Sequence, residues 1–159
     1  MRAIIQRVTN AKVKTKQTSS QIGKGFLVLI AATHTDTPED AKYLGNKIAN
    51  LRIMADEHGK MNRSLSDEKG EVLVVSQFTL YARTRKGNRP SFIDAAEPDK
   101  AKALYGEFLR VMQEDSIPVK TGTFGEYMQV SLTNDGPVTI IIDSRERNRP
   151  RKQSQKGAG

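Results

Sequence analysis

Residues 71–81 read Glu-Val-Leu-Val-Val-Ser-Gln-Phe-Thr-Leu-Tyr and form the strongest strand pattern in the chain. The unbroken aliphatic run at its start is typical of a buried strand. A second continuous run, residues 25–32, predicts another strand that is buried on both faces. Shorter patterns predict strands at residues 3–8, 11–16, 51–54, 127–132 and 138–143, with a tight-turn sequence at 134–137 between the last two.

Two segments carry helix signals instead. Thr37 suits a helix N-cap and Pro38 the first helical position, after which apolar residues recur every three or four positions up to Leu51. A second helix is predicted from about Pro98 to Asp115, with one apolar face that we interpret as core, formed by Ala101, Leu104, Tyr105, Phe108 and Met112. Strands with two inserted helices predict a single domain of the α/β class in its α+β form, with a layered, mostly antiparallel sheet, a barrel-like core and both helices on one side.

Composition narrows the function classes. The 159 residues correspond to one domain. They include no cysteine, which excludes disulfides, thiolate catalysis and cysteine-ligated metals. The two histidines, His34 and His58, are far apart and lack metal-site spacing, so we expect no metal and no cofactor. The longest apolar run has seven residues, whereas a membrane span needs about 20, and we expect neither a span nor a signal peptide. A cytoplasmic location is the simplest expectation.

Positive charge is concentrated in three blocks of a chain whose net charge is +8. Residues 1–16 hold five basic residues and no acid, residues 82–93 hold four and no acid, and residues 144–159 hold six with one acid. Segregated blocks of this kind favour a polyanionic partner such as RNA or DNA, although solubility alone is an alternative. The last block has no large apolar residue, so we expect residues 144–159 to form a mobile basic tail after a domain of residues 1–143.

The common catalytic motifs are missing. There is no Walker A sequence, no Gly-x-Gly-x-x-Gly after a strand, and no convincing partner for a serine–histidine–aspartate triad. An enzyme with this sequence would work by positioning and by backbone dipoles. Ser76, Gln77 and Thr79 lie where a buried strand ends, and N–H groups left unpaired there could face an oxyanion. An ordinary strand end with satisfied hydroxyls is the alternative.

The second notable segment is Gly136-Pro137. Only about 5–6% of X-Pro bonds in folded proteins are cis, so a trans bond is expected by default. A cis bond would turn the two flanking carbonyl groups to the same side, where they could receive an ammonium group.

These two segments together resemble the D-aminoacyl-tRNA deacylase family, formerly called D-tyrosyl-tRNA deacylase. The resemblance rests on residues 76–81 and 134–139, and on shorter stretches in the family's order at 1–8, 59–62, 86–92 and 122–125. It covers about residues 1–143 and implies a homodimeric hydrolase, with its active site at the subunit interface, that releases D-amino acids from tRNA.

The resemblance also implies residue roles. Ser76, Gln77, Phe78 and Thr79 would form the catalytic site, with the Phe78 N–H as oxyanion donor and the 2′-hydroxyl of the tRNA ribose assisting hydrolysis. Gly136 and Pro137, joined by a cis bond and braced by Arg7, would reach into the partner's site and hold the α-amino group. They would exclude L-residues by steric conflict and admit glycine.

Lys86 and Arg89 would contact tRNA phosphates. Arg83 stands where the family commonly has an acid, and Glu126 where it commonly has a small residue. A non-catalytic nucleic-acid-binding protein on the same scaffold is the alternative function.

Overall fold

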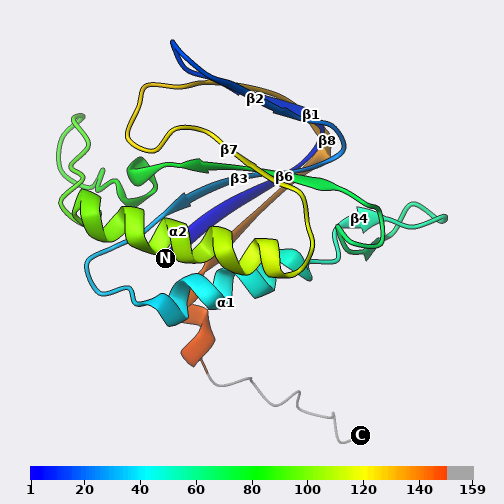
Figure 1. The fold of residues 1–159 in the computed structure, drawn as a ribbon. Helices are drawn as coiled ribbons and strands as arrows, with labels where there is room; N and C mark the ends of the chain where they lie inside the picture. The colour runs from blue at the N-terminus through cyan, green and yellow to red at the C-terminus, as the bar shows by residue number, and fades with distance from the viewer. Residues whose placement is uncertain (150–159) are drawn as a thin grey trace, which may run out of the picture.

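A computed structural model describes residues 1–149. Its main sheet has the strand order β2 (Ser19–Ile22), β1 (Arg2–Lys14), β3 (Gly25–Ala31), β6 (Glu71–Ser76) and β7 (Val119–Thr121). A sixth strand, β8 (Gln129–Asp143), pairs with the other side of β1. A two-stranded sheet of β4 (Met54–Ala55) and β5 (Met61–Arg63) stands beside it. Helices α1 (Pro38–Ala49) and α2 (Pro98–Glu114) lie together on one face of the main sheet (Figure 1). The predicted fold class is therefore confirmed.

The sheet is mixed, with a larger parallel part than the sequence predicts. β1 pairs antiparallel with β2, β3 and β8, whereas β3 pairs parallel with β6, and β6 with β7. The reason is the position of the helices in the chain. α1 lies between β3 and β6, and α2 between β6 and β7, and a helical crossover returns the chain in the same direction.

Helix α1 begins as its sequence predicts. The Thr37 side chain and the Asp40 carboxylate form a reciprocal capping box, and Pro38 occupies the first turn. Its buried face packs with that of α2 against the sheet, in a core that includes Phe26, Leu44 and Phe108. A smaller core on the other face of the sheet gathers Val8, Ala11, Val13, Ile22, Leu27, Leu73 and Val75. β3 lies between the two cores, which explains its continuous apolar sequence.

Two pairs of predicted strands prove to be single long strands. Residues 3–8 and 11–14 belong to β1, which runs unbroken from Arg2 to Lys14, so that the predicted strand 11–16 ends two residues early. Residues 129–132 and 138–143 belong to β8, which begins two residues later than predicted, and both halves of β8 pair with β1. The predicted turn at 134–137 is instead a bulge opposite Arg7, because Val8 pairs with Asn134 while Gln6 pairs with Thr139. Residues 134–137 are suited to a turn between two strands or to a bulge within one strand. The bulge forms because the residues before and after it pair with the same strand, β1.

Two other boundaries differ from the prediction. The strand predicted at 51–54 is only Met54–Ala55. β6 ends at Ser76, and Phe78–Tyr81 form a 3-10 helix, η1.

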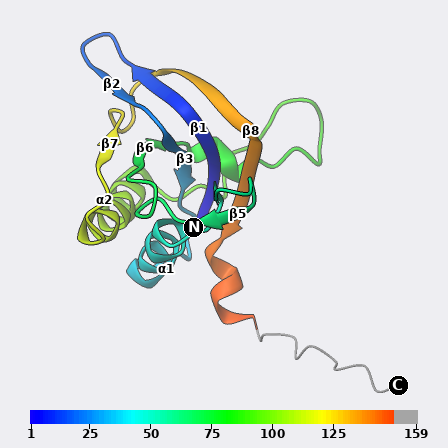
Figure 2. The same ribbon diagram turned by 90° about the vertical axis from the view of Figure 1, so that its right-hand side faces the viewer.

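The expectation of a mobile tail is wrong for its first residues, since Ser144–Asn148 form a second 3-10 helix, η2. Figure 2 shows η2 below the strands. The remainder of that expectation, residues 150–159, lies outside the described part of the chain.

Contacts made by residues 143–147, where β8 continues into η2, hold η2 against the rest of the fold. Ser144 is buried and its N–H donates to the Met1 carbonyl, 2.8 Å away. Arg147 lies 3.5 Å from Asp40 of α1. Hydrogen bonds from Arg145 hold the pKa of Asp143 well below its usual range, with Arg2 as a further donor. No helix in residues 1–149 is long and apolar enough to cross a membrane.

Candidate functional site

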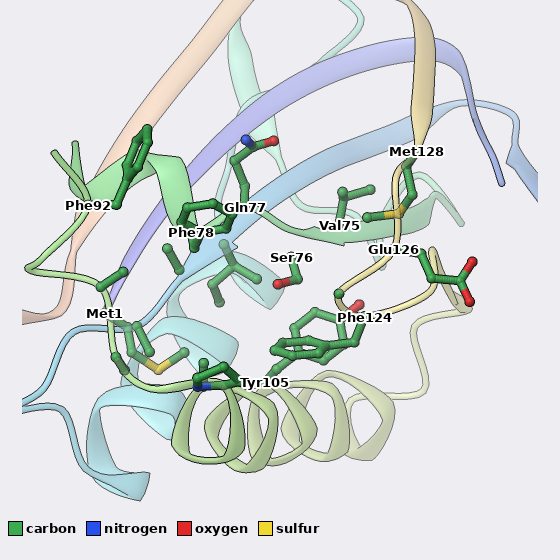
Figure 3. A pocket seen from close by; sticks show the side chains of 18 of the residues that line it. Met1, Val75, Ser76, Gln77, Phe78, Phe92, Tyr105, Phe124, Glu126 and Met128 are labelled. Atoms are coloured by element: carbon green, nitrogen blue, oxygen red, sulfur yellow. The ribbon is translucent and has the colours of Figure 1, made fainter. Parts of the chain in front are cut away.

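A cavity of about 610 Å³ opens where β3 and β6 end, beside the start of α2. Its wall is mostly apolar, and it draws residues from the N-terminus, both strand ends, α2 and the segment between β7 and β8. The strand ends contribute Val75, Ser76, Gln77 and Phe78, and the facing segment contributes Phe124, Gly125, Glu126, Tyr127 and Met128 (Figure 3). A concave, largely apolar cavity with a few polar groups is the usual form of a small-molecule site.

The polar groups of the cavity lie where sheet pairing stops. Ser76 is the last residue of β6 to pair with β3, opposite Ile30, and the Gln77 N–H still donates to the Ile30 carbonyl at 2.8 Å. The N–H groups of Phe78 and Thr79, in the first turn of η1, make no hydrogen bond with any described residue. Unpaired donors at the start of a helical turn are available to an anionic ligand.

Thr79 belongs to this turn but does not line the cavity. Its hydroxyl accepts a hydrogen bond from the Gln77 side-chain amide. An amide nitrogen cannot take up a proton, so this contact orients Thr79 without making it a nucleophile. Of the four predicted catalytic residues, the structure thus places Ser76, Gln77 and Phe78 on the cavity wall, whereas Thr79 is not part of that wall.

Aromatic side chains form two parts of the cavity wall. Phe78 and Phe92 meet edge to face with ring centroids 5.2 Å apart, and Tyr105 of α2 packs on Phe124 at 5.7 Å. The Tyr105 hydroxyl donates to the Val74 carbonyl at 3.1 Å, and burial raises the pKa of this phenol. The helical periodicity predicts Tyr105 only as a core residue, because it cannot show that the core ends at a cavity.

Arg7 fixes the bulge that carries Gly136 and Pro137. The side chain is 11% exposed and extends from β1 to two backbone carbonyls, with Nη1 donating to Ile53 at 2.7 Å and Nε to Asp135 at 3.0 Å. The Asp135 carboxylate lies 3.1 Å from the same Nε. Arg7 is therefore not the exposed strand residue that its position in the sequence would otherwise suggest.

The bulge itself has an unusual backbone. The Gly136–Pro137 bond is cis, and Gly136 has a φ of +138°, a conformation that favours glycine. A Cβ at Gly136 would lie 2.9 Å from the Val138 nitrogen. Gly136 and Pro137 are exposed, and neither lines the cavity of its own chain. The structure therefore does not bring the two predicted halves of the site together within one chain.

The basic loop, which we define as residues 82–93, lies next to the cavity, because Phe92 is part of the cavity wall. Its base is closed by backbone pairing of Arg83 with Ser91 and by a two-point ion pair of Arg83 with Asp94. The positive charge of Arg83 is thus paired with the carboxylate of Asp94. Lys86 and Arg89 are exposed at the tip, without an ion pair to any of residues 1–149.

No group of three or more potential metal ligands comes together among residues 1–149. His34 lies with Nε2 2.7 Å from the Ile93 carbonyl, and His58 is in the predicted exposed turn.

The chain matches known proteins over almost all of its folded part. The family model described as D-Tyr-tRNA(Tyr) deacylase matches residues 4–143. A D-aminoacyl-tRNA deacylase of Bacillus pumilus (strain SAFR-032) is 56% identical over 147 residues, which are 92% of this chain and 100% of the relative. A protein of the same name from Thermus aquaticus is 56% identical over 148 residues, covering 92% and 97%.

Two solved structures are similar to this chain over about nine-tenths of its length. The structure called "c-Myc DNA Unwinding Element Binding Protein" has a TM-score of 0.83 and 40% identity, and the match covers 90% of this chain and 98% of that one. A structure described as a probable eukaryotic D-amino acid tRNA deacylase has a TM-score of 0.75 with 19% identity over 89% and 97%, which is a likeness of fold alone.

Proposed function

The chain belongs to the D-Tyr-tRNA(Tyr) deacylase family, whose members hydrolyse aminoacyl-tRNA esters, and we propose that its own site releases D-amino acids from tRNA. The observation that carries this proposal is the unpaired N–H group of Phe78, a residue on the wall of a mostly apolar cavity. In ester hydrolysis the carbonyl oxygen becomes an oxyanion, and a preplaced backbone donor stabilises that charge. The Phe78 N–H is the donor that we assign to it.

In this proposal the attacking group is water, and the group that assists its attack comes from the substrate. Thr79 has only an amide as partner, and residues 1–149 offer it no base within hydrogen-bonding distance. The terminal ribose of an aminoacyl-tRNA carries a 2′-hydroxyl next to the ester, and this hydroxyl assists the hydrolysis. Aminoacyl esters are labile, so positioning together with one oxyanion donor is sufficient chemistry. Gln77 and Thr79 orient the reacting end.

A second copy of the chain completes the site. The Gly136-Pro137 bulge is exposed, held by Arg7, and absent from its own chain's cavity. In a homodimer the bulge of one chain would enter the cavity of the other, and its two carbonyl groups would accept hydrogen bonds from the substrate's α-ammonium group. Exposed apolar side chains near these surfaces, Phe78 at 57% and Ile141 at 66%, would be covered by the same contact.

Chirality follows from this arrangement. With the ammonium group held by the carbonyls and the ester at Phe78, the two remaining positions on the α-carbon are fixed. A D-residue directs its side chain to free space, whereas an L-residue directs it into the backbone of the clamp. Glycine has no side chain to exclude, so glycyl-tRNA is also a substrate in this proposal.

Lys86 and Arg89 supply the electrostatic contact to tRNA. They are exposed in a loop whose base reaches the cavity wall through Phe92. Contacts to phosphates carry no sequence information, which suits an enzyme that accepts many tRNAs. Since aminoacylated tRNA is used in translation, we place this activity in the cytoplasm.

Hydrolysis of D- and L-tyrosyl-tRNA tests the proposal. We expect the D-ester to be cleaved well above the buffer rate and the L-ester to be spared. Thr79→Ala should keep much of the activity, and its complete loss in a folded variant would restore Thr79 as the nucleophile. If neither ester is cleaved faster than in buffer, the non-catalytic nucleic-acid-binding alternative, which also fits the name of the 40% identical structure, replaces the enzyme.

Two glycine variants test the clamp separately. Gly136→Ala forces the bulge to move, because the new Cβ would lie 2.9 Å from the Val138 nitrogen. We expect it to lose discrimination between the D- and L-esters. Gly59→Ala is the matched control, since Gly59 also has a positive φ but stands in an exposed turn with nothing within 4 Å of the added Cβ. Unchanged selectivity in a folded Gly136→Ala variant would refute the clamp.

A further inference from the structure

A second, smaller hollow lies beside the mouth of the main cavity. It has a volume of about 310 Å³ and is lined by Lys16 and Gln17 on one side and by Glu126 and Tyr127 on the other. Glu126 and Tyr127 also line the main cavity, so the two hollows are adjacent and share these two residues. The β1–β2 hairpin and the segment between β7 and β8 lie on the same side of the molecule, away from the helices (Figures 1 and 2).

The hairpin tip is held by its own hydrogen bonds. Thr15 is buried, and its Oγ1 accepts from the N–H groups of Gln17 at 3.1 Å and Thr18 at 2.9 Å. The Thr15 N–H donates to the Thr18 carbonyl at 2.9 Å. The Thr18 hydroxyl then lies 3.3 Å from that of Thr123, which ties the tip to the opposite segment. Lys16 and Gln17 therefore face Tyr127 from a fixed position.

The lining residues combine a cation, an anion and an exposed aromatic ring. Tyr127 is 86% exposed, and Lys16 is exposed and makes no ion pair with residues 1–149. An exposed ring beside a free lysine suits an unstacked base with its phosphate. Glu126, whose carboxylate points away from Phe124 in Figure 3, would repel a phosphate and accept a hydrogen bond from an exocyclic amino group.

We propose that this hollow binds the nucleotide that precedes the terminal adenosine of the substrate RNA. Its base stacks on Tyr127, its phosphate pairs with Lys16, and its amino group donates to Glu126. In tRNA this nucleotide is a cytidine, whose N4 amino group is such a donor. The inference rests on the proposed function, because the RNA strand that leaves the main cavity is taken to be the aminoacylated 3′ end.

The test compares two esters, D-tyrosyl-tRNA and D-tyrosyl-adenosine, which lacks the preceding nucleotide. Base–aromatic stacking is worth about 1–3 kcal/mol. Tyr127→Ala should therefore lower kcat/KM for the tRNA ester about 5- to 150-fold more than for the adenosine ester, mainly through KM. Tyr127→Phe keeps the ring and should restore the parent's ratio.

Lys16 is tested by salt dependence. Lys16→Ala should reduce the slope of log(kcat/KM) against log[salt] for the tRNA ester by about 0.7, the contribution of one single-strand phosphate. Lys47→Ala, which removes an exposed lysine of α1 on the helical face, is the matched control and should leave the slope unchanged.

Equal losses on both esters with Tyr127→Ala, or an equal slope change with the two lysine variants, would overturn the proposal. Unfolding midpoints of all variants should match the parent, because the substituted side chains are exposed. If the parent cleaves neither ester, the deacylase activity itself fails. If instead the parent cleaves both esters and Tyr127→Ala lowers the two activities equally, only the nucleotide site fails.

Discussion

Arg7 offers the sharpest test of how the bulge is held. Its guanidinium group donates to the carbonyls of Ile53 and Asp135, at 2.7 and 3.0 Å, from a side chain that is almost entirely buried. A hydrogen bond from a charged donor contributes about 1.5–3 kcal/mol. Arg7→Ala removes two and should lower the free energy of unfolding by about 3–6 kcal/mol. Arg7→Lys has one compact donor and should lose about half of that.

The measurement is urea unfolding at one fixed protein concentration, because a dimer would make the midpoint depend on concentration. A loss of 3–6 kcal/mol is a large part of a typical domain's stability, so Arg7→Lys provides the value if Arg7→Ala does not fold.

Arg52→Ala is the control. Arg52 also donates from Nε to a backbone carbonyl, that of Asn62 at 2.7 Å, but it is exposed and should change stability by no more than about 0.5 kcal/mol. If both Arg7 variants stay within 0.5 kcal/mol of the parent, or if Arg52→Ala costs as much as Arg7→Ala, the bracing role is refuted.

Four further substitutions test other parts of the structure. Gly25→Ala would place a Cβ 1.9 Å from the Glu71 carbonyl and should cost about 3 kcal/mol or more in urea unfolding, whereas Gly106→Ala, on an open face of α2, should stabilise by about 0.5–1 kcal/mol. Tyr105→Phe removes one of two donors to the Val74 carbonyl, which keeps the Gly122 N–H at 3.2 Å, and should cost about 0.5–1.5 kcal/mol; an unchanged midpoint would show that this bond is dispensable. Asp143→Asn should lower the thermal midpoint at pH 7. Because the folded pKa of Asp143 is depressed, its contribution is complete above the unfolded value of about 3.9 and is lost as the pH falls further, so the difference from the parent should shrink below pH 4; a constant difference would contradict this.

Local sequence signals were sufficient to predict features that depend on a single helix or strand. The cap at Thr37 and Pro38 starts α1 as predicted, and the apolar face of the second predicted helix is the buried face of α2. The pattern of residues 71–81 predicted β6, although the strand ends at Ser76 and Phe78–Tyr81 form η1. The functional residues at 76–79 and 136–137 came from the resemblance to a family, because no periodicity or spacing marks a backbone N–H or a carbonyl as reactive.

What the sequence determined by itself is the two helices with their buried faces, the longer strands and the family, whereas the short strands β2, β5 and β7 were not predicted. The tertiary structure alone decided that Asn134–Pro137 bulges out of a single strand, because both halves of β8 pair with the same neighbour. It also placed Tyr105 and Phe124 on a cavity wall and set Lys16 opposite Tyr127. These arrangements join residues far apart in the chain, and pairing across such distances depends on how strands and helices pack, which local patterns do not encode.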